Sequence, residues 1–459
     1  MKLFSLAITK MSQSAFPKAL AIHQLKKKAI SSRCYRANVH CESGSVFPGG
    51  SSMLFDLPIL SRSYVDPSNM YLKFKLKFKA APTAATFLDK SAHSLITRIV
   101  QSSGGNILSD VSSYGQLAAA LMDLQCPASQ QTSDNNLTIG SGLDAKLPNK
   151  GIAVTEASDV TFCIPLFTGL NSCQRMLSLD TQSPIRYQFY LASAVQAFFS
   201  ETVAGGAGIP QYEITEPELI CNITEISQEA SVLLNQAISS AGYNVFMTDY
   251  SVITQQIPQA SSKVIHNLAF RFSALSSVMI VQQVSSNESD GTNNGVSNRS
   301  RNKLKSYKFI VGGQSMPSSG VQISDTNLGE ALNETQISFG LMSDLVNTHC
   351  LNHVNATNEA SENYKLNYGV TALTAGDAEA KPMIAATQGS FVCALDLDTF
   401  KTPLSDENFY SGLNVQSSSI SCELSYEGTT TSSCIATYFA RYEAIVSLDE
   451  VSNCYVASV

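Results

Sequence analysis

The segment 70–80, MYLKFKLKFKA, alternates apolar and polar side chains without a break. Its apolar positions are Leu72, Phe74, Leu76 and Phe78, and lysines occupy most positions between them. A side-chain period of two is the geometry of a β-strand, and one apolar face indicates a strand that is buried on that face and wet on the other. The outward lysines could form a stripe that binds nucleic acid, but we favour a solvated sheet surface that discourages aggregation.

The composition favours strands over long surface helices. Charged residues make up 15% of the 459 residues, against about a quarter in ordinary soluble proteins. Long surface helices usually carry many Lys and Glu, whereas strands, loops and surfaces that neighbouring subunits cover can do without them. A chain of this length exceeds one ordinary core, so we expect two domains or three.

Strand and helix patterns follow in a recognisable order in the first half of the chain. Strands are predicted at 70–80, 95–100, 160–167, 185–195 and 219–226, a Ser-Ser-Gly-Gly turn at 102–105, a helix at 109–124, a long polar loop at 126–158, and a connector helix at 228–241. Ser109 or Asp110 is the expected N-cap of the first helix, and Ser227 that of the second.

The second half repeats this order. Strands are predicted at 245–253, 264–281, 307–311, 391–397, 420–426 and 434–448, a helix at 326–345, and polar loops at 282–305 and 346–382. Gly312 and Gly313 follow a strand just as Gly104 and Gly105 do. The sequences of the two halves have negligible identity, so the repeat lies in the order of elements.

Short strands joined by loops of 20–40 residues indicate two antiparallel sandwiches in tandem. A jelly roll places its loops at the ends of two sheets and so tolerates long insertions. The predicted fold class is therefore mainly β, two tandem jelly rolls with short flanking helices and long loops. The predicted domains are a basic N-terminal arm at 1–44, a first jelly roll at 45–227, the connector helix at 228–242 and a second jelly roll at 243–459.

A basic arm precedes an acidic body. Residues 1–36 hold eight lysines and arginines and no acid, whereas the rest of the chain carries a net charge of −15. Such an arm is typical of a tail that contacts nucleic acid, an anionic membrane or a neighbouring copy, although it could also be a solvated tail. Outside this arm no apolar run is long enough to span a membrane, so we expect a soluble chain.

The cysteines are single, scattered and odd in number, eleven in all. Several, such as Cys163 and Cys393, lie within apolar strand patterns, where a free thiol behaves as a small buried hydrophobe. We therefore expect reduced thiols and assembly inside a cell.

Few residues suggest chemistry. His349, Cys350 and His353 could begin a zinc site, but no second ligand pair follows. Asp396 and Asp398 would point the same way from a strand, yet a solvent-facing edge explains them better than a cation. The glycine runs at 204–208 and 312–313 lack the Lys-Ser/Thr of a phosphate loop. We expect no catalytic, cofactor-binding or metal-binding residues, and so no enzyme.

Four segments carry a resemblance to a known family: DPSNMYLKFKLKF (66–78), GGNILSDVSSYGQLAAALMDLQ (104–125), IPLFTGLNSCQRMLSLDTQSPIRYQFYLASA (164–194) and YFARYEAIVSLDEVSNCYV (438–456). With the two-half organisation they make residues 45–459 resemble the double jelly-roll major capsid proteins of small eukaryotic double-stranded DNA viruses, the polinton-like virus, adintovirus and virophage group. Each segment is a pattern of residue types and none is a sharp motif.

The resemblance implies a homotrimer that forms a pseudo-hexagonal capsomer of an icosahedral shell. It implies capsomer contacts, penton and minor capsid proteins as partners, loops as an outer crown, and an arm beneath the shell near genome, inner membrane or neighbouring capsomers. The protein would be located in the virion. The alternatives are a two-domain β-sandwich spike or glycan-binding protein, which the absence of Trp disfavours, and a β-sandwich hydrolase with an unrecognised site.

Overall fold

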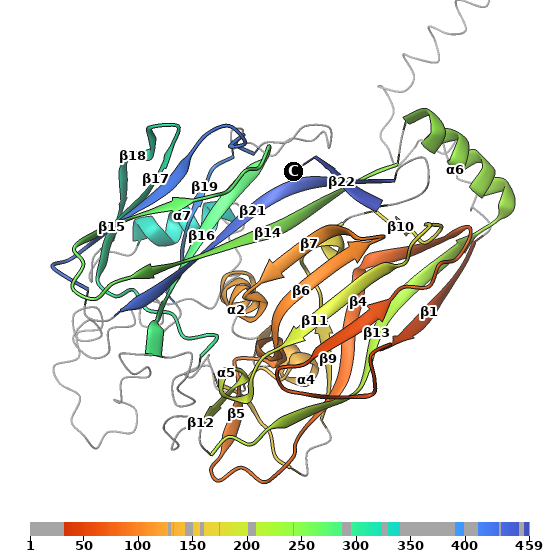
Figure 1. The fold of residues 1–459 in the computed structure, drawn as a ribbon, viewed down its shortest axis with the longest axis horizontal. Coiled ribbons are helices and arrows are strands. Elements are labelled where there is room, and N and C mark those ends of the chain that lie inside the picture. Colours follow the sequence, from red (N-terminus) through yellow and green to blue (C-terminus); the bar gives the residue numbers. More distant parts are fainter. Residues whose placement is uncertain are drawn as a thin grey trace, which may run out of the picture.

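Two β-sandwiches lie side by side in the computed structural model (Figure 1). The structure describes residues 32–126, 130–131, 133–142, 150–156, 160–173, 175–200, 208–241, 243–286, 295–323, 329–339, 391–398, 412–430, 433–448 and 454–458. No helix in these ranges is both long enough and apolar enough to span a bilayer.

The first sandwich contains two main antiparallel sheets and a small third one. Its strands are β1 (Ser32–His40), β2 (Val46–Pro48), β3 (Ser52–Asp56), β4 (Ser63–Phe78), β5 (Thr86–Asp89), β6 (Ile96–Ser103), β7 (Asn106–Ser112), β8 (Lys150–Ala153), β9 (Val160–Pro165), β10 (Leu177–Ser178), β11 (Ile185–Leu191), β12 (Phe198–Ser200) and β13 (Tyr212–Ile226). One sheet has the order β1–β13–β4–β10, with β2 on β13 and β9 on β4, and the other has the order β3–β11–β6–β7.

The second sandwich is built in the same way. Its strands are β14 (Asn244–Ile257), β15 (Lys263–Leu268), β16 (Leu275–Val284), β17 (Leu304–Val311), β18 (Gln314–Gln322), β19 (Cys393–Asp396), β20 (Ile420–Tyr426), β21 (Cys434–Leu448) and β22 (Cys454–Ser458). One sheet has the order β14–β21–β16–β19, with β22 on β21, and the other has the order β15–β20–β17–β18.

Short helices join these strands. They are η3 (Ala92–Leu95), α2 (Tyr114–Gln125), α4 (Asp134–Ile139), η4 (Gly169–Ser172), α5 (Ala194–Ala197), α6 (Gln228–Ala241) and α7 (Gly329–Ser338). α6 begins and ends where the sequence predicts, and the hydroxyl of Ser227 accepts the backbone N–H of Ala230 at 3.4 Å.

Both sandwiches have the strand order of a jelly roll. In the first sheet of each, β1 pairs with β13 and β13 with β4 just as β14 pairs with β21 and β21 with β16. In the second sheet the order β3–β11–β6–β7 corresponds to β15–β20–β17–β18. A helix follows the hairpin with the Gly-Gly turn in both halves, α2 after β7 and α7 after β18. The predicted fold class is therefore confirmed, and the repeat seen in the sequence is a repeat of topology.

The two glycine pairs occupy equivalent hairpin turns. Gly104 and Gly105 join β6 to β7 with φ of 57° and 88°, and Gly312 and Gly313 join β17 to β18 with φ of 56° and 85°. A two-residue hairpin with φ positive at both positions matches the right-handed twist of its strands, and glycine adopts it without strain. The glycines are therefore a requirement of the turn rather than a phosphate loop.

The strand 70–80 belongs to the longer β4, which lies in the centre of its sheet. Leu72, Phe74, Leu76 and Phe78 are all buried in the core, as their spacing predicts. The same alternation buries Ile185, Tyr187, Phe189 and Leu191 of β11 from the opposite sheet. These two faces form much of the first core.

β14 and β21 form a long ribbon that serves both sandwiches. They pair without a bulge from Asn244 opposite Ser447 to Ile257 opposite Cys434. At one end Val245 belongs to the hydrophobic core of the first sandwich, and at the other end Ile257 belongs to that of the second. In Figure 1 the ribbon runs from the second sandwich across β7 of the first.

Neighbouring β16 is buried on both faces. Met279 and Val281 pack into the first core, while Val278 and Ile280 pack into the second. The alternation of a strand sends adjacent side chains to opposite faces, so the segment 278–281, which lies between two cores, is apolar at every position. This explains why the sequence of 275–281 lacks the alternation of the outer strands.

Three predicted elements differ from the structure. The helix predicted at 109–124 begins at Tyr114, because residues 106–112 continue the hairpin as β7, and Ser113 rather than Ser109 or Asp110 precedes it. The strand predicted at 264–281 is two strands, β15 and β16, in different sheets. The loop predicted at 126–158 contains α4 and β8.

Part of the predicted N-terminal arm belongs to the first sandwich. Residues 32–40 form β1, which pairs along its whole length with β13, from Ser32 opposite Ile226 to His40 opposite Glu218. Tyr35, Ala37 and Val39 of β1 pack against the core. Residues 1–31, which hold most of the basic charge, lie outside the described residues.

A Gly313→Ala variant tests the requirement for glycine in the hairpin turn. No atom lies within 4 Å of the position that the new Cβ would take, so the cost is conformational. We expect the free energy of unfolding to fall by about 1–2 kcal/mol, the cost of placing an L-residue in the left-handed region. Urea denaturation measures the change. The control Ser318→Ala, on the exposed part of β18, leaves the midpoint in place, and equal midpoints for both variants would refute the requirement.

Candidate functional site

The residues that the sequence singled out for metal chemistry do not form a site in the described part of the chain. His349, Cys350 and His353 lie outside it, so the expectation about them stays a prediction. Asp396 Oδ1 accepts the backbone N–H of Asp398 at 3.0 Å, and both side chains are half-buried. Among the described residues, no three His, Cys, Asp or Glu side chains are grouped so as to hold a metal ion.

Lysines of β4, and Lys79 directly after it, face glutamates of β13 across the sheet. Nζ of Lys73 lies 3.0 Å from Glu218, and Nζ of Lys79 lies 3.2 Å from Glu213. Lys75 lies 3.0 Å from Glu216 in the same way. Cross-strand pairs of opposite charge balance this face, which supports the sheet-surface interpretation over a nucleic-acid stripe.

Ten of the eleven cysteines fall within the described residues, and all ten are free thiols. Cys173, Cys221, Cys393, Cys422, Cys434 and Cys454 are buried. Burial raises the pKa of the Cys221 thiol to about 11 and that of Cys173 to about 12. These thiols are therefore protonated and act as small apolar side chains in the core, as expected.

The main structural feature outside the two cores is the junction between the sandwiches. Here one end of the β14–β21 ribbon, together with β22, covers β7 and η4 of the first sandwich. The hydroxyl of Ser172 in η4 bonds both the N–H and the C=O of Thr248 in β14, each at 2.7 Å. The amide of Asn106 in β7 donates to the carbonyl of Cys454 in β22 at 3.1 Å.

A carboxyl group is buried within this junction. Asp249 of β14 is completely buried and accepts a hydrogen bond from the hydroxyl of Tyr442 at 3.0 Å. Burial raises the pKa of Asp249 to about 6, and its hydrogen bonds offset part of that effect. The titratable groups that interact with Asp249 are Tyr442 on β21, Tyr250 on β14 and Cys173 after η4.

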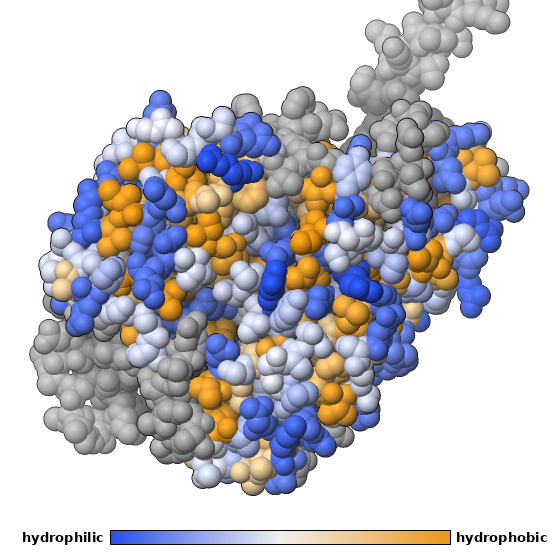
Figure 2. Space-filling model, in the orientation of Figure 1, coloured by the Kyte–Doolittle hydropathy of each residue, from blue (hydrophilic) through white to orange (hydrophobic). Residues whose placement is uncertain are grey.

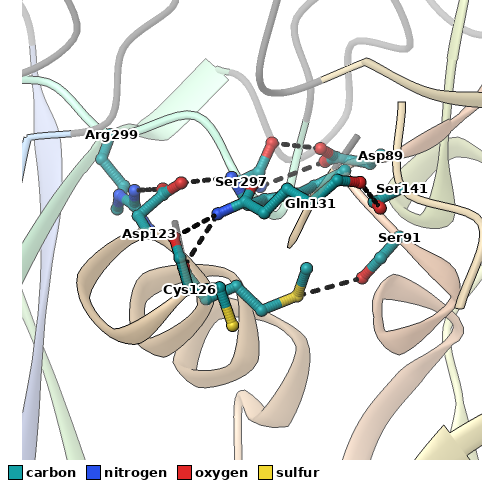
Figure 3. Close-up of polar contacts among 10 residues, drawn as sticks. Asp89, Ser91, Asp123, Cys126, Gln131, Ser141, Ser297 and Arg299 are labelled. Carbon is teal, nitrogen blue, oxygen red and sulfur yellow. Dashed lines mark hydrogen bonds and ion pairs between the residues drawn. The ribbon is translucent and has the colours of Figure 1, made fainter. Parts of the chain in front are cut away.

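A second part of the junction is a buried cluster of charges (Figure 3). Asp123 of α2 receives Lys90 from the first sandwich on one oxygen and Arg299 from the second on the other. All three side chains are almost completely buried. A buried carboxylate is tolerated where groups of opposite charge reach it, and Lys90 and Arg299 are the groups that reach Asp123.

The segment of the second sandwich that carries Arg299 is also held by a second carboxylate. Asp89 accepts the backbone N–H groups of Val296 at 2.7 Å and Ser297 at 3.1 Å, and the hydroxyl of Ser297 as well. Gln131 donates to the carbonyl of Met122 at 2.8 Å and so supports the end of α2. Figure 3 shows Asp89 and Asp123 facing Ser297 and Arg299. Residues 295–302 are thereby inserted between the sandwiches.

This insertion differs from the sequence prediction, which treated 282–305 as an exposed polar loop. Arg299 and Arg301 are completely buried instead. The sequence of α2 gives one signal that a buried cation is needed. Residues 114–124 of this helix are buried almost without exception. A helix that is apolar all round is buried, and the single Asp123 in it therefore needed a buried cation. Nothing in the sequence identifies Arg299 as that cation.

An open cleft of about 580 Å³ lies beside the junction. Arg98 on its wall makes two hydrogen bonds to Asp110, at 2.7 and 2.5 Å, which engage its guanidinium. Phe272 and Tyr442 stack with ring centroids 4.1 Å apart. The first contact joins β6 to β7 of the first sandwich, and the second joins the segment before β16 to β21 of the second, so the cleft is lined from both sandwiches.

No protein-family model matches the sequence, and no curated protein matches it. Solved structures of viral capsid chains match the fold over nearly its whole length. The Faustovirus major capsid protein has a TM-score of 0.59 at 8% identity, with 96% of this chain and 94% of that chain covered. PBCV-1 VP54, fitted into a reconstruction of the virophage Sputnik, has a TM-score of 0.58 at 10% identity, with 95% and 98% covered.

The mavirus major capsid protein is a third neighbour, with a TM-score of 0.51 at 9% identity and coverage of 96% of this chain and 95% of that one. All three likenesses extend over both sandwiches. At these identities they concern the fold. The chain has the fold of the double jelly-roll major capsid proteins of large double-stranded DNA viruses and virophages, which confirms the resemblance drawn from the sequence.

An Asp123→Asn variant tests the charge cluster. The substitution removes the carboxylate that Lys90 and Arg299 share, and we expect the free energy of unfolding to fall by about 3–5 kcal/mol, as for other broken buried ion pairs. Urea denaturation measures it. The matched control Asp110→Asn removes the carboxylate of the exposed Arg98 pair and costs about 1 kcal/mol or less. Equal losses in the two variants would contradict the account.

An Asp249→Asn variant tests the buried carboxyl. Its pKa is raised from 3.8 to about 6 in the folded chain, so the folded state binds a proton that the unfolded state lacks between those values. The stability contributed by this group therefore rises as the pH falls from 7 to 4, by roughly 2 kcal/mol. Between pH 7 and pH 4 we expect the free energy of unfolding of the wild type to rise by this amount relative to that of Asp249→Asn, as measured by thermal or urea unfolding. Parallel pH profiles would show that Asp249 has an ordinary pKa.

Proposed function

We propose that this chain is a major capsid protein that self-assembles as trimers into an icosahedral viral shell. The observation that carries the proposal is the pair of jelly rolls with one strand order, joined through a shared ribbon into a single two-lobed body. The three capsid chains that share this fold over nearly their full length support it.

A subunit with two lobes of one topology suits a closed ring. Three copies arranged head to tail place six similar lobes around an axis. A trimer of one kind of chain then approximates a hexagonal block that can tile a surface. The surface seen in Figure 2 fits such use, because hydrophobic residues form small separate groups among hydrophilic ones. Interfaces between separately folded subunits have about this mixture.

The role proposed is structural and non-enzymatic, and its location is the virion shell after assembly in a host cell. The proposed partners are other copies of the chain, then penton and minor capsid proteins. Residues 1–31 hold six lysines and no acid, a composition suited to the genome, an anionic inner membrane or an acidic neighbouring surface.

We also propose the division of the chain that the sequence suggests, with β1 added to the first unit. The first jelly roll then spans residues 32–227, 228–242 is the connector, and 243–459 is the second jelly roll. The separate hydrophobic core of the second sandwich supports this division, although the first core extends into the β14–β21 ribbon.

A truncation that removes residues 2–31 tests the function. We expect the full chain to form a trimer by light scattering and larger particles by electron microscopy. The truncated chain keeps every strand that the structure describes, so it should remain a trimer. The yield of particles should fall at least tenfold, because the contacts of the arm are lost.

A second truncation, of residues 2–40, is the matched comparison. It also deletes β1 and exposes the edge of β13, so it should lower the thermal unfolding temperature, which the shorter truncation leaves unchanged. A full-length chain that stays monomeric, or that binds glycans as a monomer, would overturn the capsid proposal in favour of a spike or glycan-binding protein.

A further inference from the structure

The junction inside the chain pairs two distinct surfaces. On the first sandwich the surface is an edge made of β7 and η4. On the second it is the end of the β14–β21 ribbon, extended by β22, which follows the last strand of that jelly roll. Leu108, Ser109 and Val111 of β7 are buried as a result. We call the first surface the edge and the second the ribbon end.

The second sandwich has the same edge, but it is exposed. β18 is the strand equivalent to β7, because both are the edge strand next to the hairpin partner in their sheet and both follow a Gly-Gly turn. Gln314, Ser318, Ser319 and Gln322 of β18 are exposed. Gln314 stands directly after its glycine pair, as Asn106 does in β7, and the amide of Asn106 bonds β22 across the junction.

The first sandwich has an equivalent ribbon end, which is exposed too. β1 and β13 are its first and last strands, as β14 and β21 are in the second sandwich. Ser32, Arg33 and Cys34 at the beginning of β1 are exposed. α6 follows β13 as β22 follows β21, since Ser32 pairs with Ile226 and α6 begins at Gln228.

α6 presents apolar side chains to solvent at this end. Val232 is 51% exposed, Leu233 68% and Leu234 38%. Hydrophobic surface also shows in Figure 2 where Figure 1 places α6. Three adjacent exposed aliphatic residues on a helix are a mark of an interaction surface, because scattered single residues are what an ordinary surface carries.

The two exposed surfaces lie at opposite ends of the long axis of the molecule, with β18 at one end and α6 at the other (Figure 1). A contact between unlike surfaces of successive copies is heterologous, and it forms a ring when the rotation closes.

We propose that α6 and the adjoining end of the β1–β13 pair in one copy dock against β18 of a second copy. This contact would repeat between copies what the ribbon end and β22 make with β7 inside the chain. The inference rests on the proposed function, in that it names the surfaces by which the proposed trimer closes. α6 is then the element that joins one subunit to the next, in addition to connecting the two jelly rolls.

Two complementary variants test the contact. Variant A, Val232→Ser with Leu233→Ser, alters α6 and leaves β18 intact. Variant B, Ser318→Arg with Ser319→Arg, alters β18 and leaves α6 intact. The control Ile265→Ser changes an aliphatic residue that is 55% exposed on β15, the opposite edge of that sheet from β18. Light scattering gives the mass of each, and circular dichroism confirms folding.

We expect the wild type and the control to have three chain masses and variants A and B each to have one. A mixture of A and B should give two chain masses, because β18 of A and α6 of B form one good contact that cannot close a ring. This recovery also shows that both variants are folded.

The outcomes separate the inference from the proposed function. A monomeric wild type overturns both. A trimeric wild type with a trimeric variant A or B refutes the contact while leaving the capsid function in place. Variants A and B that are both monomeric but do not associate when mixed show that the two surfaces do not meet each other, which also overturns the contact.

Discussion

The architecture depends on one ribbon that two hydrophobic cores share. β14 and β21 pair over their full length, and their two ends are buried in different sandwiches. Because the ribbon is a continuous hydrogen-bonded ladder, the sandwiches cannot separate without exposing apolar surface at one end of it. A second strand, β16, adds to the coupling, since alternate side chains enter alternate cores. The two jelly rolls are therefore joined through their folding and not through a linker alone.

Buried charge gives this junction its specificity. Apolar packing is tolerant of small shifts, whereas Asp123 must meet Lys90 and Arg299, and Asp89 must meet the backbone at 296–297. An unpaired buried charge costs several kcal/mol, so the junction is stable in the arrangement that satisfies these groups and in few others. Fixing the angle between the lobes would matter for the proposed trimer, since an error in angle would be repeated at every contact of the ring.

The sequence predicted what depends on local pattern. The alternation in β4 and β11, the Gly-Gly turns and α6 were all predictable, because each follows from side-chain periodicity or backbone conformation. The buried arginines were not, since Arg299 lies in a polar run and its partner Asp123 is 176 residues away. Strand β1 was also missed. Its pattern of Tyr35, Ala37 and Val39 is short, and its pairing partner comes much later in the chain.

The central claim is that the chain is a two-lobed subunit that closes into a ring of three. Electron microscopy of the purified oligomer, viewed along its symmetry axis, tests this most directly. The account predicts a flat block with three-fold symmetry and six similar lobes around its rim, two from each copy. A particle with two-fold symmetry, an open filament, or a two-lobed monomer would contradict it.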